Sequence, residues 1–272
     1  AVAQTLKNAI EMGRVAHAYL FCGTRGVGKT TMARVLAKSM NCLEVDGPTV
    51  TPCLKCDSCV SVNAGEDIDV IKIDGASNTG VDNIRQLREN AIYRPARARF
   101  KIYIIDEVHM LSTGAFNALL KILEEPPEHV KFIFATTDVH KVLPTILSRC
   151  QRFDLRRISV QDIVDRLRKG CDEEGVGISE DALLAIARGA EGGLRDAESA
   201  LDQIISFRGK EISEDDVLAV FGLVTRHVLE NLTVAILKSD VPGIINIVAK
   251  MDRAGKELQR VVMELMEHFR NM

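Results

Sequence analysis

The fold is decided by one stretch of the sequence, Gly23-Thr24-Arg25-Gly26-Val27-Gly28-Lys29-Thr30. It matches the pattern G-x-x-x-x-G-K-[ST] at every fixed position, and we expect Thr31 to join its cofactor contacts. Glycines let the backbone curl around a phosphate, Lys29 can reach the β- and γ-phosphate oxygens, and Thr30 can ligate Mg²⁺. The apolar run 18–22 precedes this loop and a helix-forming run, 31–38, follows it, so a helix N-terminus adds to the anion site. A chance glycine turn would lack this context, and the stretch therefore predicts a nucleoside triphosphate site.

Two acids end a second apolar run. Residues 100–105 form the most apolar strand of the chain, and Asp106 and Glu107 follow them directly. Asp106 is expected to hold the hydration shell of Mg²⁺, and Glu107 to polarise the attacking water. A solvated acidic strand end is the alternative, but the phosphate loop upstream favours the catalytic interpretation.

Three later polar residues are weaker candidates. Thr137 ends the strand expected over 130–137 and could reach the γ-phosphate, although a strand-end threonine often has no such role. Arg149 precedes the short run 152–155 and could act as an arginine finger in a neighbouring subunit's site. Arg195 begins a later helix and could sense the phosphates from within the chain. Spacing alone leaves both arginine roles open, because a lone arginine is usually a surface residue.

Four of the seven cysteines are crowded into one segment, with the spacing Cys42-x₁₀-Cys53-x₂-Cys56-x₂-Cys59. Four thiolates at this spacing suit a tetrahedral Zn²⁺. An iron–sulfur cluster or thiols without metal are the alternatives. Because no His or carboxylate completes an open site, we expect the zinc to be structural and not catalytic.

The order of the expected elements places an α/β domain first. Over residues 1–157, apolar strand runs alternate with helical runs, which predicts an ATPase core with a parallel five-stranded sheet covered on both faces. The expected strands are 18–22, 69–74, 100–105, 130–137 and 152–155. A polar insertion over 41–64, which carries the clustered cysteines, interrupts this core.

Helical periodicity replaces this pattern from Ser159 onward. We expect helices capped by Ser159, Ser179 and Ser213, and no strands. A composition break near Gly222 divides this part into a small helical lid, 158–222, and a helical collar or oligomerisation region, 223–272. The chain starts inside a helix without Met and ends without a stop signal, so we expect it to be a piece of a longer protein.

Composition narrows the partners and the compartment. The formal net charge of −3 does not indicate a protein that binds nucleic acids over its whole surface. Any contact with nucleic acid must therefore come from a local basic patch. No apolar run approaches the roughly 20 residues of a membrane span. The odd cysteine count argues against a disulfide framework, and we expect a cytoplasmic protein without membrane contact.

Several longer motifs accompany the phosphate loop and the four cysteines. They are His17-Ala18-Tyr19-Leu20-Phe21, Asp106-Glu107-Val108-His109-Met110-Leu111, Phe116-Asn117-Ala118-Leu119-Leu120-Lys121, Leu123-Glu124-Glu125-Pro126-Pro127-Glu128, Ala135-Thr136-Thr137-Asp138 and Ser148-Arg149-Cys150. Together they resemble the gamma/tau family, the AAA+ ATPase subunits of the bacterial DNA polymerase III clamp loader. The resemblance covers about Val2 to Gly222 and is weak beyond.

This resemblance implies an ATP-driven motor within a hetero-pentamer of clamp-loader subunits, which opens a ring-shaped sliding clamp and loads it on primed double-stranded DNA. The implied roles are ATP and Mg²⁺ binding by Lys29, Thr30 and Asp106, water activation by Glu107, a first sensor at Thr137 or Thr136, a second at Arg195, a finger acting in trans at Arg149, and Zn²⁺ binding by Cys42, Cys53, Cys56 and Cys59. The family's segment before the first helix, which helps to hold adenine, is missing here.

Two other classes remain open. One is a different AAA+ DNA remodeller, against which the cysteine insertion and Ser148-Arg149-Cys150 argue. The other is a scaffold with a vestigial ATP site, against which the intact Lys29, Asp106 and Glu107 argue. The complex counts as a DNA-directed DNA polymerase, a nucleotidyltransferase, but no polymerase-like carboxylate constellation is visible, so we assign DNA synthesis to another subunit.

DNA contacts have the thinnest support in the sequence. Ser77, Asn78 and Thr79 open a helix with Gly80, so their amides and hydroxyls could receive a backbone phosphate. Lys121, on the helix after the acidic pair, could reach the same duplex and report its arrival to Glu107. A capped helix end and a solvated lysine are equally good interpretations.

Overall fold

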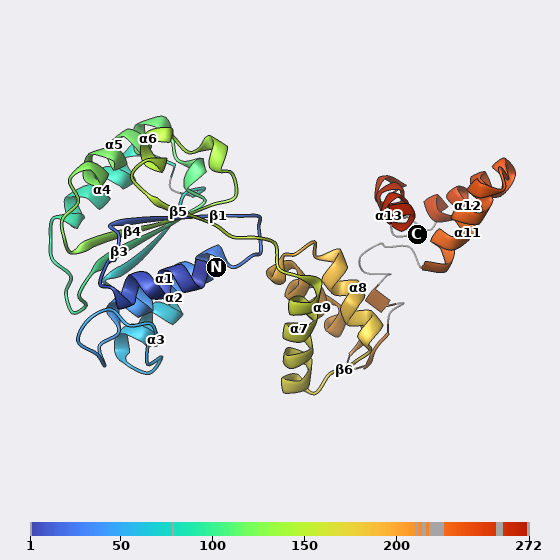
Figure 1. Cartoon of the computed structure of the whole chain (residues 1–272), viewed down its shortest axis with the longest axis horizontal. Coiled ribbons are helices and arrows are strands. Elements are labelled where there is room, and N and C mark those ends of the chain that lie inside the picture. The colour runs from blue at the N-terminus through green and yellow to red at the C-terminus, as the bar shows by residue number, and fades with distance from the viewer. Residues whose placement is uncertain are drawn as a thin grey trace. The chain divides into compact units, whose positions relative to one another are not determined.

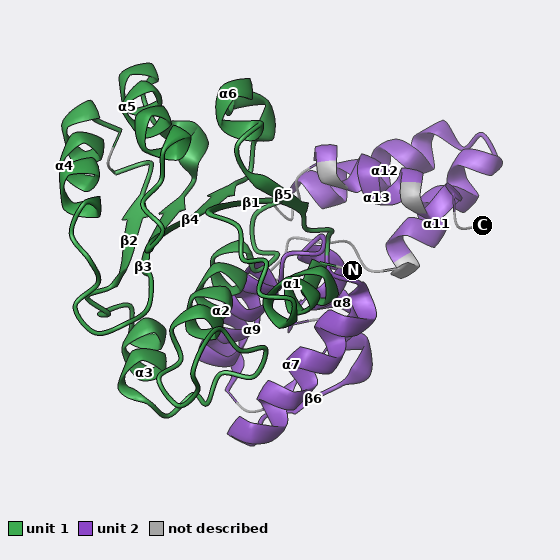
Figure 2. Cartoon of the chain, turned by 60° about the vertical axis from the view of Figure 1, so that its left-hand side comes forward, with its two compact units in different colours: residues 1–157 green, residues 158–272 purple. Residues whose placement is uncertain are grey.

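Two compact units divide the chain, residues 1–157 and residues 158–272 (Figure 2). The computed structural model describes residues 2–77, 79–209, 211–213, 216–217, 226–253 and 258–270. The candidate DNA residue Asn78 and the predicted boundary near Gly222 lie outside this described part. The division of the second unit into lid and collar therefore stays a prediction.

The first unit is built on a five-stranded parallel sheet in the order β2-β3-β4-β1-β5, which confirms the α/β prediction. The strands are β1 (Ala18–Cys22), β2 (Val70–Asp74), β3 (Lys101–Asp106), β4 (Val130–Thr136) and β5 (Gln151–Asp154). The three inner strands β3, β4 and β1 are almost wholly buried. The outer strands β2 and β5 are short and carry Lys72, Asp74, Arg152 and Asp154.

Side chains of the inner strands alternate between two cores. In β1, Leu20 belongs to the core beneath α4 (Val81–Ala91), α5 (Thr113–Glu124) and α6 (Pro144–Leu147), while Phe21 belongs to the core beneath α1 (Val2–Glu11) and α2 (Lys29–Asn41). Figure 1 shows these two sets of helices on opposite faces of the sheet. Nearly continuous apolar strands of this kind are typical of a parallel sheet that is covered on both faces.

The insertion contains a helix that the sequence pattern did not predict, α3 (Asp57–Ala64). Hydrogen bonds join the residues at the start of the insertion to the residues just before β3. The side-chain amide of Asn41 exchanges two hydrogen bonds with the backbone of Phe100, at 2.8 and 3.1 Å. Arg99 donates to the carbonyls of Cys42, at 2.8 Å, and Val45. The cysteine segment is thus anchored to the strand that ends in the acidic pair.

A second anchor involves two buried acids between α3 and β2. Asp67 accepts hydrogen bonds from Ser61 at 2.5 Å and from Arg97 at 2.8 Å. Asp69 accepts three backbone amides, those of residues 96, 97 and 98, at 2.7 to 2.9 Å. The loop before β3 therefore wraps around two carboxylates.

The second unit begins with a helical cluster made of α7 (Val160–Glu174), α8 (Glu180–Gly189) and α9 (Leu194–Arg208). Ser159 and Ser179 cap α7 and α8 as predicted, each accepting the amide three residues on. The expectation of no strands was wrong. Gly177–Ile178 (β6) and Glu211–Ile212 (β7) form a two-residue parallel pair, too short to leave an alternating pattern in the sequence. The hydroxyl of Ser213 donates to Asp216 at 2.7 Å.

Three further helices close the described part: α11 (Arg226–Leu237), α12 (Val241–Arg253) and α13 (Leu258–Arg270). Their small core is centred on Leu232, Met251 and Val261. Within the described residues, no helix is both long and apolar enough to cross a membrane.

Candidate active site

The phosphate loop joins β1 to α2. Gly28, the residue before α2, has φ of 91°, a left-handed conformation that favours glycine. No side chain caps α2, so its first amides remain as donors for an anion. The ammonium of Lys29 donates to the carbonyls of Gly23 and Thr24, at 3.0 and 2.9 Å, and so lies across the loop. Burial lowers the pKa of Lys29, and the charges of Glu107 and Asp106 oppose that effect.

The residues expected to bind Mg²⁺ are brought together. The hydroxyl of Thr30, in the first turn of α2, donates to Oδ2 of Asp106 at 2.7 Å. Lys72 of β2 lies 3.8 Å from the same oxygen. A hydroxyl and a carboxylate oxygen at this separation are ligands that suit a hard divalent cation.

Glu107 follows β3 in a left-handed conformation, with φ of 46°. Its Oε2 accepts the backbone amide of Thr137 at 3.1 Å and the hydroxyl of Thr137 at 2.9 Å. The hydroxyl of Thr136 turns instead to Asp138 and His109. Of the two threonines proposed as first sensor, Thr137 is the one that contacts the Glu107 carboxylate.

Close backbone packing holds the acidic pair beside the end of β2. The amide of Gly75 donates to the carbonyl of Asp106 at 2.8 Å. A Cβ atom at Gly75 would lie 2.6 Å from the carbonyl oxygen of Glu107, so no other residue fits without a backbone shift. The loop that leads to Ser77 and Thr79 is therefore joined directly to Asp106 and Glu107.

The structure adds His109 to the site. It lies in a 3-10 turn, η1 (Val108–Met110), with Nδ1 3.4 Å from Oε2 of Glu107 and 3.0 Å from Oγ1 of Thr136. The sequence motif contained His109, but its contact with Thr136 depends on the pairing of β3 with β4. The only signal in the sequence was its position two residues after Glu107.

The two candidate arginines lie in different units. Arg149 follows α6, with its side chain 33% exposed, and pairs with Glu124 of α5 at 2.9 Å. Its guanidinium also donates to the carbonyl of Thr145 at 2.8 Å. Arg195 is the second residue of α9 in the second unit and is exposed.

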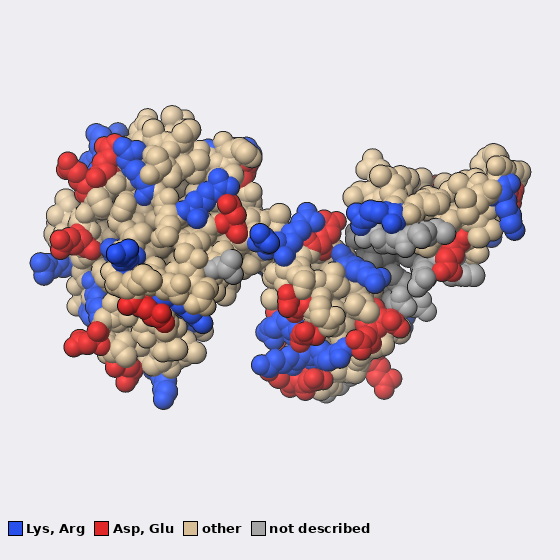
Figure 3. Space-filling view, in the orientation of Figure 1, with Lys and Arg blue, Asp and Glu red and all other residues tan. Residues whose placement is uncertain are grey.

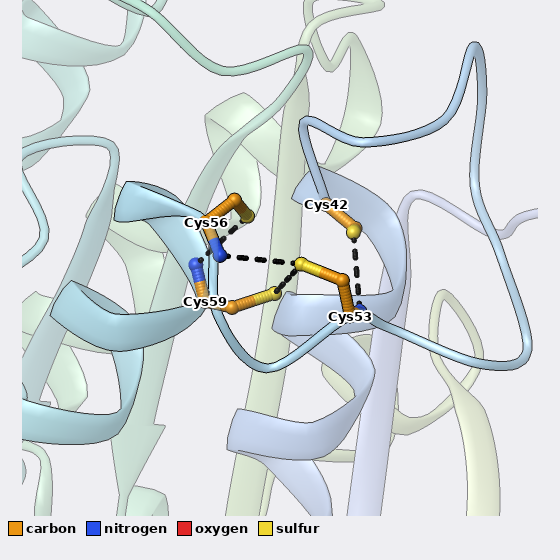
Figure 4. Close-up of side chains that lie close together, drawn as sticks. All are labelled: Cys42, Cys53, Cys56 and Cys59. Carbon is orange, nitrogen blue, oxygen red and sulfur yellow. Dashed lines mark hydrogen bonds between the residues drawn. The ribbon is translucent and has the colours of Figure 1, made fainter.

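The four cysteines converge (Figure 4), with their Sγ atoms all within 4.8 Å of one another. Four sulfurs placed 2.3 Å from a central Zn²⁺ would be separated by about 3.8 Å, so small side-chain adjustments complete a tetrahedron. Cys53 and Cys59 already have their sulfurs 4.0 Å apart. All seven cysteines of the chain are free thiols.

Backbone amides point at several of these sulfurs, and such hydrogen bonds favour the thiolate form of a cysteine. Amides of Lys55 and Cys56 lie 3.4 and 3.2 Å from Sγ of Cys53 and lower its pKa to about 7. The amide of Cys59 lies 3.5 Å from Sγ of Cys56. Burial raises the pKa of Cys59 to about 12, a cost that a bound cation would offset.

The residues proposed for DNA contact are dispersed. The hydroxyl of Ser77 donates to Asp74 at 2.6 Å, and the carbonyl of Thr79 accepts the amide of Ser112 at 3.2 Å. Lys121 is exposed near the other end of α5, about 13 Å of helix from Ser112. Basic and acidic side chains are interspersed on the face shown in Figure 3.

Family models match both units of the chain. A model described as "DNA polymerase III, delta subunit" matches residues 1–159. A second, described as "DNA polymerase III clamp loader subunit, ATPase lid domain", matches residues 162–210.

Curated relatives match nearly the whole chain. It is 45% identical to DNA polymerase III subunit tau of Bacillus subtilis, over 100% of this chain and 48% of that protein. Identity to subunit tau of Escherichia coli is 45%, over 97% of this chain and 41% of that protein. Subunit gamma of Buchnera aphidicola from Acyrthosiphon pisum is 42% identical, over 97% of this chain and 73% of that protein. The chain thus spans less than half of these tau relatives.

Solved structures share the fold at low identity. The Holliday junction branch migration motor RuvB of Thermotoga maritima superposes with a TM-score of 0.55 at 17% identity, over 86% of this chain and 73% of that chain. The first unit therefore has the AAA+ ATPase fold.

Proposed function

The chain belongs to the gamma/tau family of DNA polymerase III subunits, and from that membership we propose that it is an ATP-driven motor of a clamp loader. In this proposal it joins other loader subunits in a hetero-pentamer, opens a ring-shaped sliding clamp and loads it on primed double-stranded DNA. The observation that carries the proposal is the convergence of the phosphate loop, Asp106, Glu107 and Thr137 at the carboxyl ends of β1, β3 and β4.

Each residue has a distinct task at this edge of the sheet. Lys29 and the first amides of α2 bind the phosphates of ATP. Thr30 and Asp106 hold Mg²⁺, which would neutralise phosphate charge when bound. Glu107 orients and polarises the attacking water, and Thr137 holds the Glu107 carboxylate. Of the two candidate arginines, Arg149 would act in trans as the finger that stabilises charge developing on the γ-phosphate, and Arg195 would be the second sensor.

The cysteine cluster supports a structural role for Zn²⁺. The ligands would be Cys42, Cys53, Cys56 and Cys59, whose sulfurs all lie within 4.8 Å of one another and would need only small adjustments to bind one central cation. The hydrogen bonds from Asn41 to Phe100 and from Arg99 to Cys42 join the cysteine segment to the residues just before β3. Loss of the bound zinc would therefore lower the stability of the fold and leave the affinity for ATP nearly unchanged. Seven free thiols suit a reducing compartment, and we place the protein in the cytoplasm.

DNA contact is proposed for the loop at the start of α4 and for Lys121. Gly80, the residue before α4, has no side chain with which to cap that helix, and the amides of the first turn of α4 are the proposed donors to a phosphate. Asp74 already accepts the hydroxyl of Ser77, and its negative charge opposes a phosphate there. Thr79 is therefore the better contact of the two described residues.

Two substitutions test the motor function in the reconstituted loader. Lys29→Ala should abolish ATP binding, because it removes the cation that lies across the loop. Glu107→Gln should bind ATP normally and lose hydrolysis, because an amide cannot polarise water. Lys7→Ala and Glu11→Gln, both exposed on α1, are matched controls that should behave as the unmodified chain.

The readouts are ATP affinity by calorimetry and ATPase turnover with and without clamp and primed DNA. Equal loss of binding in Lys29→Ala and Glu107→Gln would contradict the assigned roles. Turnover that clamp and primed DNA do not stimulate, but that a DNA junction does, would identify a different AAA+ remodeller.

A further inference from the structure

The imidazole of His109 has no task in the site described above, yet it contacts the carboxylate that polarises water. Its Nδ1 lies 3.4 Å from Oε2 of Glu107 and 3.0 Å from Oγ1 of Thr136. The side chain is only 9% exposed. A buried ring nitrogen therefore faces two oxygens and little water.

The hydrogens around Thr136 decide which atom donates. The Thr136 hydroxyl has one hydrogen, and Oγ1 lies 3.1 Å from the carbonyl of Asp138, which can only accept. Oγ1 also accepts the amide of Asp138 at 3.1 Å. An ionised Glu107 can only accept as well. Nδ1 without a proton would face lone pairs on both sides, whereas one Nδ1–H can be shared between Oγ1 of Thr136 and Oε2 of Glu107.

We propose that His109 is a positioning residue for ATP hydrolysis: its Nδ1–H, together with Thr137, fixes Oε2 of Glu107 and leaves Oε1 for the attacking water. This inference rests on the proposed function, in which Glu107 polarises that water. Two hydrogen bonds from Thr137 reach Oε2, and Nδ1 of His109 lies 3.4 Å from the same oxygen. Among the described residues, none forms a hydrogen bond with Oε1.

The geometry explains why a donor is needed from this side. Glu107 has a left-handed backbone, and η1 begins immediately after it, so the side chain leaves the end of β3 at a sharp turn. Both bonds from Thr137 reach the carboxylate from the residue that follows β4. His109 reaches it from η1, on the other side of the turn. Donors from two directions restrict rotation of the Glu107 carboxylate. The rate of hydrolysis depends on how well this group is oriented toward the attacking water.

The test uses three variants of the full-length chain in the reconstituted loader. His109→Leu removes the donor. His109→Asn places an amide nitrogen where Nδ1 lies, and His109→Gln, its matched control, places one nearer to Nε2. For Leu and Gln we expect kcat of the clamp- and DNA-stimulated ATPase to fall about tenfold, the equivalent of 1.4 kcal/mol. ATP affinity and KM should stay within about twofold, and Asn should restore kcat to within about threefold of the unmodified chain.

The tautomer provides a readout that a merely structural histidine would not give. Nitrogen NMR of the ¹⁵N-histidine-labelled chain should show a proton on Nδ1 of His109. In Thr137→Val, the His109→Leu effect on kcat should differ from its effect in the unmodified background, because both residues hold the same oxygen.

Each outcome decides a separate point. If Asn loses as much kcat as Gln, or if the proton is on Nε2, the inference is wrong. If Glu107→Gln retains turnover, the proposed function fails, whatever His109 does. If Glu107→Gln is inactive while His109→Leu is normal, only the inference fails. Should His109→Leu not fold, the comparison of Asn with Gln still decides.

Discussion

The hydroxyl of Thr30 donates a 2.7 Å hydrogen bond to Oδ2 of Asp106, although the two residues are 76 positions apart in the sequence. These atoms are the proposed Mg²⁺ ligands, and the bond between them shows that α2 and β3 hold them at one point. Loss of one ligand should therefore weaken binding of the metal-bound nucleotide and leave the phosphate loop intact.

Thr30→Val should lower the affinity for ATP in Mg²⁺ by about tenfold or more, the range found for partners of metal sites. Thr30→Ser keeps the hydroxyl and is the matched control. Calorimetry with ATP in Mg²⁺ and in EDTA separates the metal contribution. If Thr30→Val retains the full Mg²⁺ effect, Thr30 is not a ligand.

Zinc removal should act on stability and not on the nucleotide. The purified chain should contain about one Zn²⁺, and Cys56→Ser should lower the melting temperature by several degrees, because metal binding contributes to folding free energy. ATP affinity should stay nearly unchanged.

The control is Cys150→Ser, which changes a thiol outside the cluster and should leave the zinc content as it was. Elemental analysis under reducing conditions and thermal unfolding are the measurements. A metal-free native protein, or iron in place of zinc, would refute the structural-zinc proposal.

Arg149 tests the arrangement of subunits. Arg149→Ala should leave ATP binding by the isolated subunit intact and reduce hydrolysis in the assembled loader by roughly 10³–10⁵-fold, the usual value of an arginine finger. A loader that carries the change in one subunit should lose the adjacent site only. Loss of the site in the mutated subunit itself would show that Arg149 acts in cis.

Glu124 sharpens this test, because Arg149 pairs with it within the same chain. Exposed ion pairs contribute at most about 1 kcal/mol, so Arg149 can exchange Glu124 for a neighbour's phosphate at little cost. Glu124→Gln should therefore change assembled turnover by less than about fivefold. A defect as deep as that of Arg149→Ala would give Glu124 a role of its own.

Asp67 should make the first unit sensitive to acid. Burial alone would raise the pKa of Asp67, but hydrogen bonds from Ser61 and Arg97 outweigh it and hold the pKa below its usual value. A lowered native pKa stabilises the fold above the unfolded pKa of roughly 4, and this stabilisation is lost as pH falls through the native pKa.

Asp67→Asn should consequently reduce the free energy of unfolding by about 2 kcal/mol at pH 7, within the range for a broken buried hydrogen bond. The difference from the unmodified chain should shrink below about pH 4. Urea unfolding at pH 7 and pH 3.5 measures both. An equal difference at the two pH values would exclude ionisation of Asp67 as the cause.

Lys121 tests the DNA surface. Lys121→Ala should weaken primed-DNA binding alike for all sequences and flatten its salt dependence by about one unit of slope, as loss of one phosphate contact does. DNA-stimulated ATPase should fall and basal ATP affinity should not. Lys7→Ala is the matched control. An unchanged slope with normal stimulation would remove Lys121 from the DNA site.

The sequence predicted those parts of the fold that depend on local pattern. The phosphate loop and the strands beside it could be predicted because glycine spacing and apolar runs are written in consecutive residues. The cap at Ser112, which accepts the amide of Ala115, is local in the same way. The four-cysteine cluster was predictable because the two-residue spacers between Cys53, Cys56 and Cys59 keep these thiols close together along the chain.

Contacts between distant segments could not be predicted in this way. His109 meets Thr136 only because β3 pairs with β4, and Arg149 meets Glu124 only because α6 packs against α5. Helix α3 was missed because its eight residues have little amphipathic pattern and its N-cap is a cysteine, Cys56, which is not a usual capping residue. Such features depend on tertiary packing, which a single sequence does not display.

The two outer strands of the sheet affect how the protein behaves at high concentration. An open strand edge offers unpaired amides and carbonyls to any other extended chain and so promotes aggregation. Here β2 has only five residues and carries Lys72 and Asp74, and β5 has four and carries Arg152 and Asp154. A foreign strand that paired with either edge would have to desolvate these charges, which costs more than the new hydrogen bonds return. The charged outer strands thus disfavour self-association through the edges of a sheet whose inner strands are almost wholly buried.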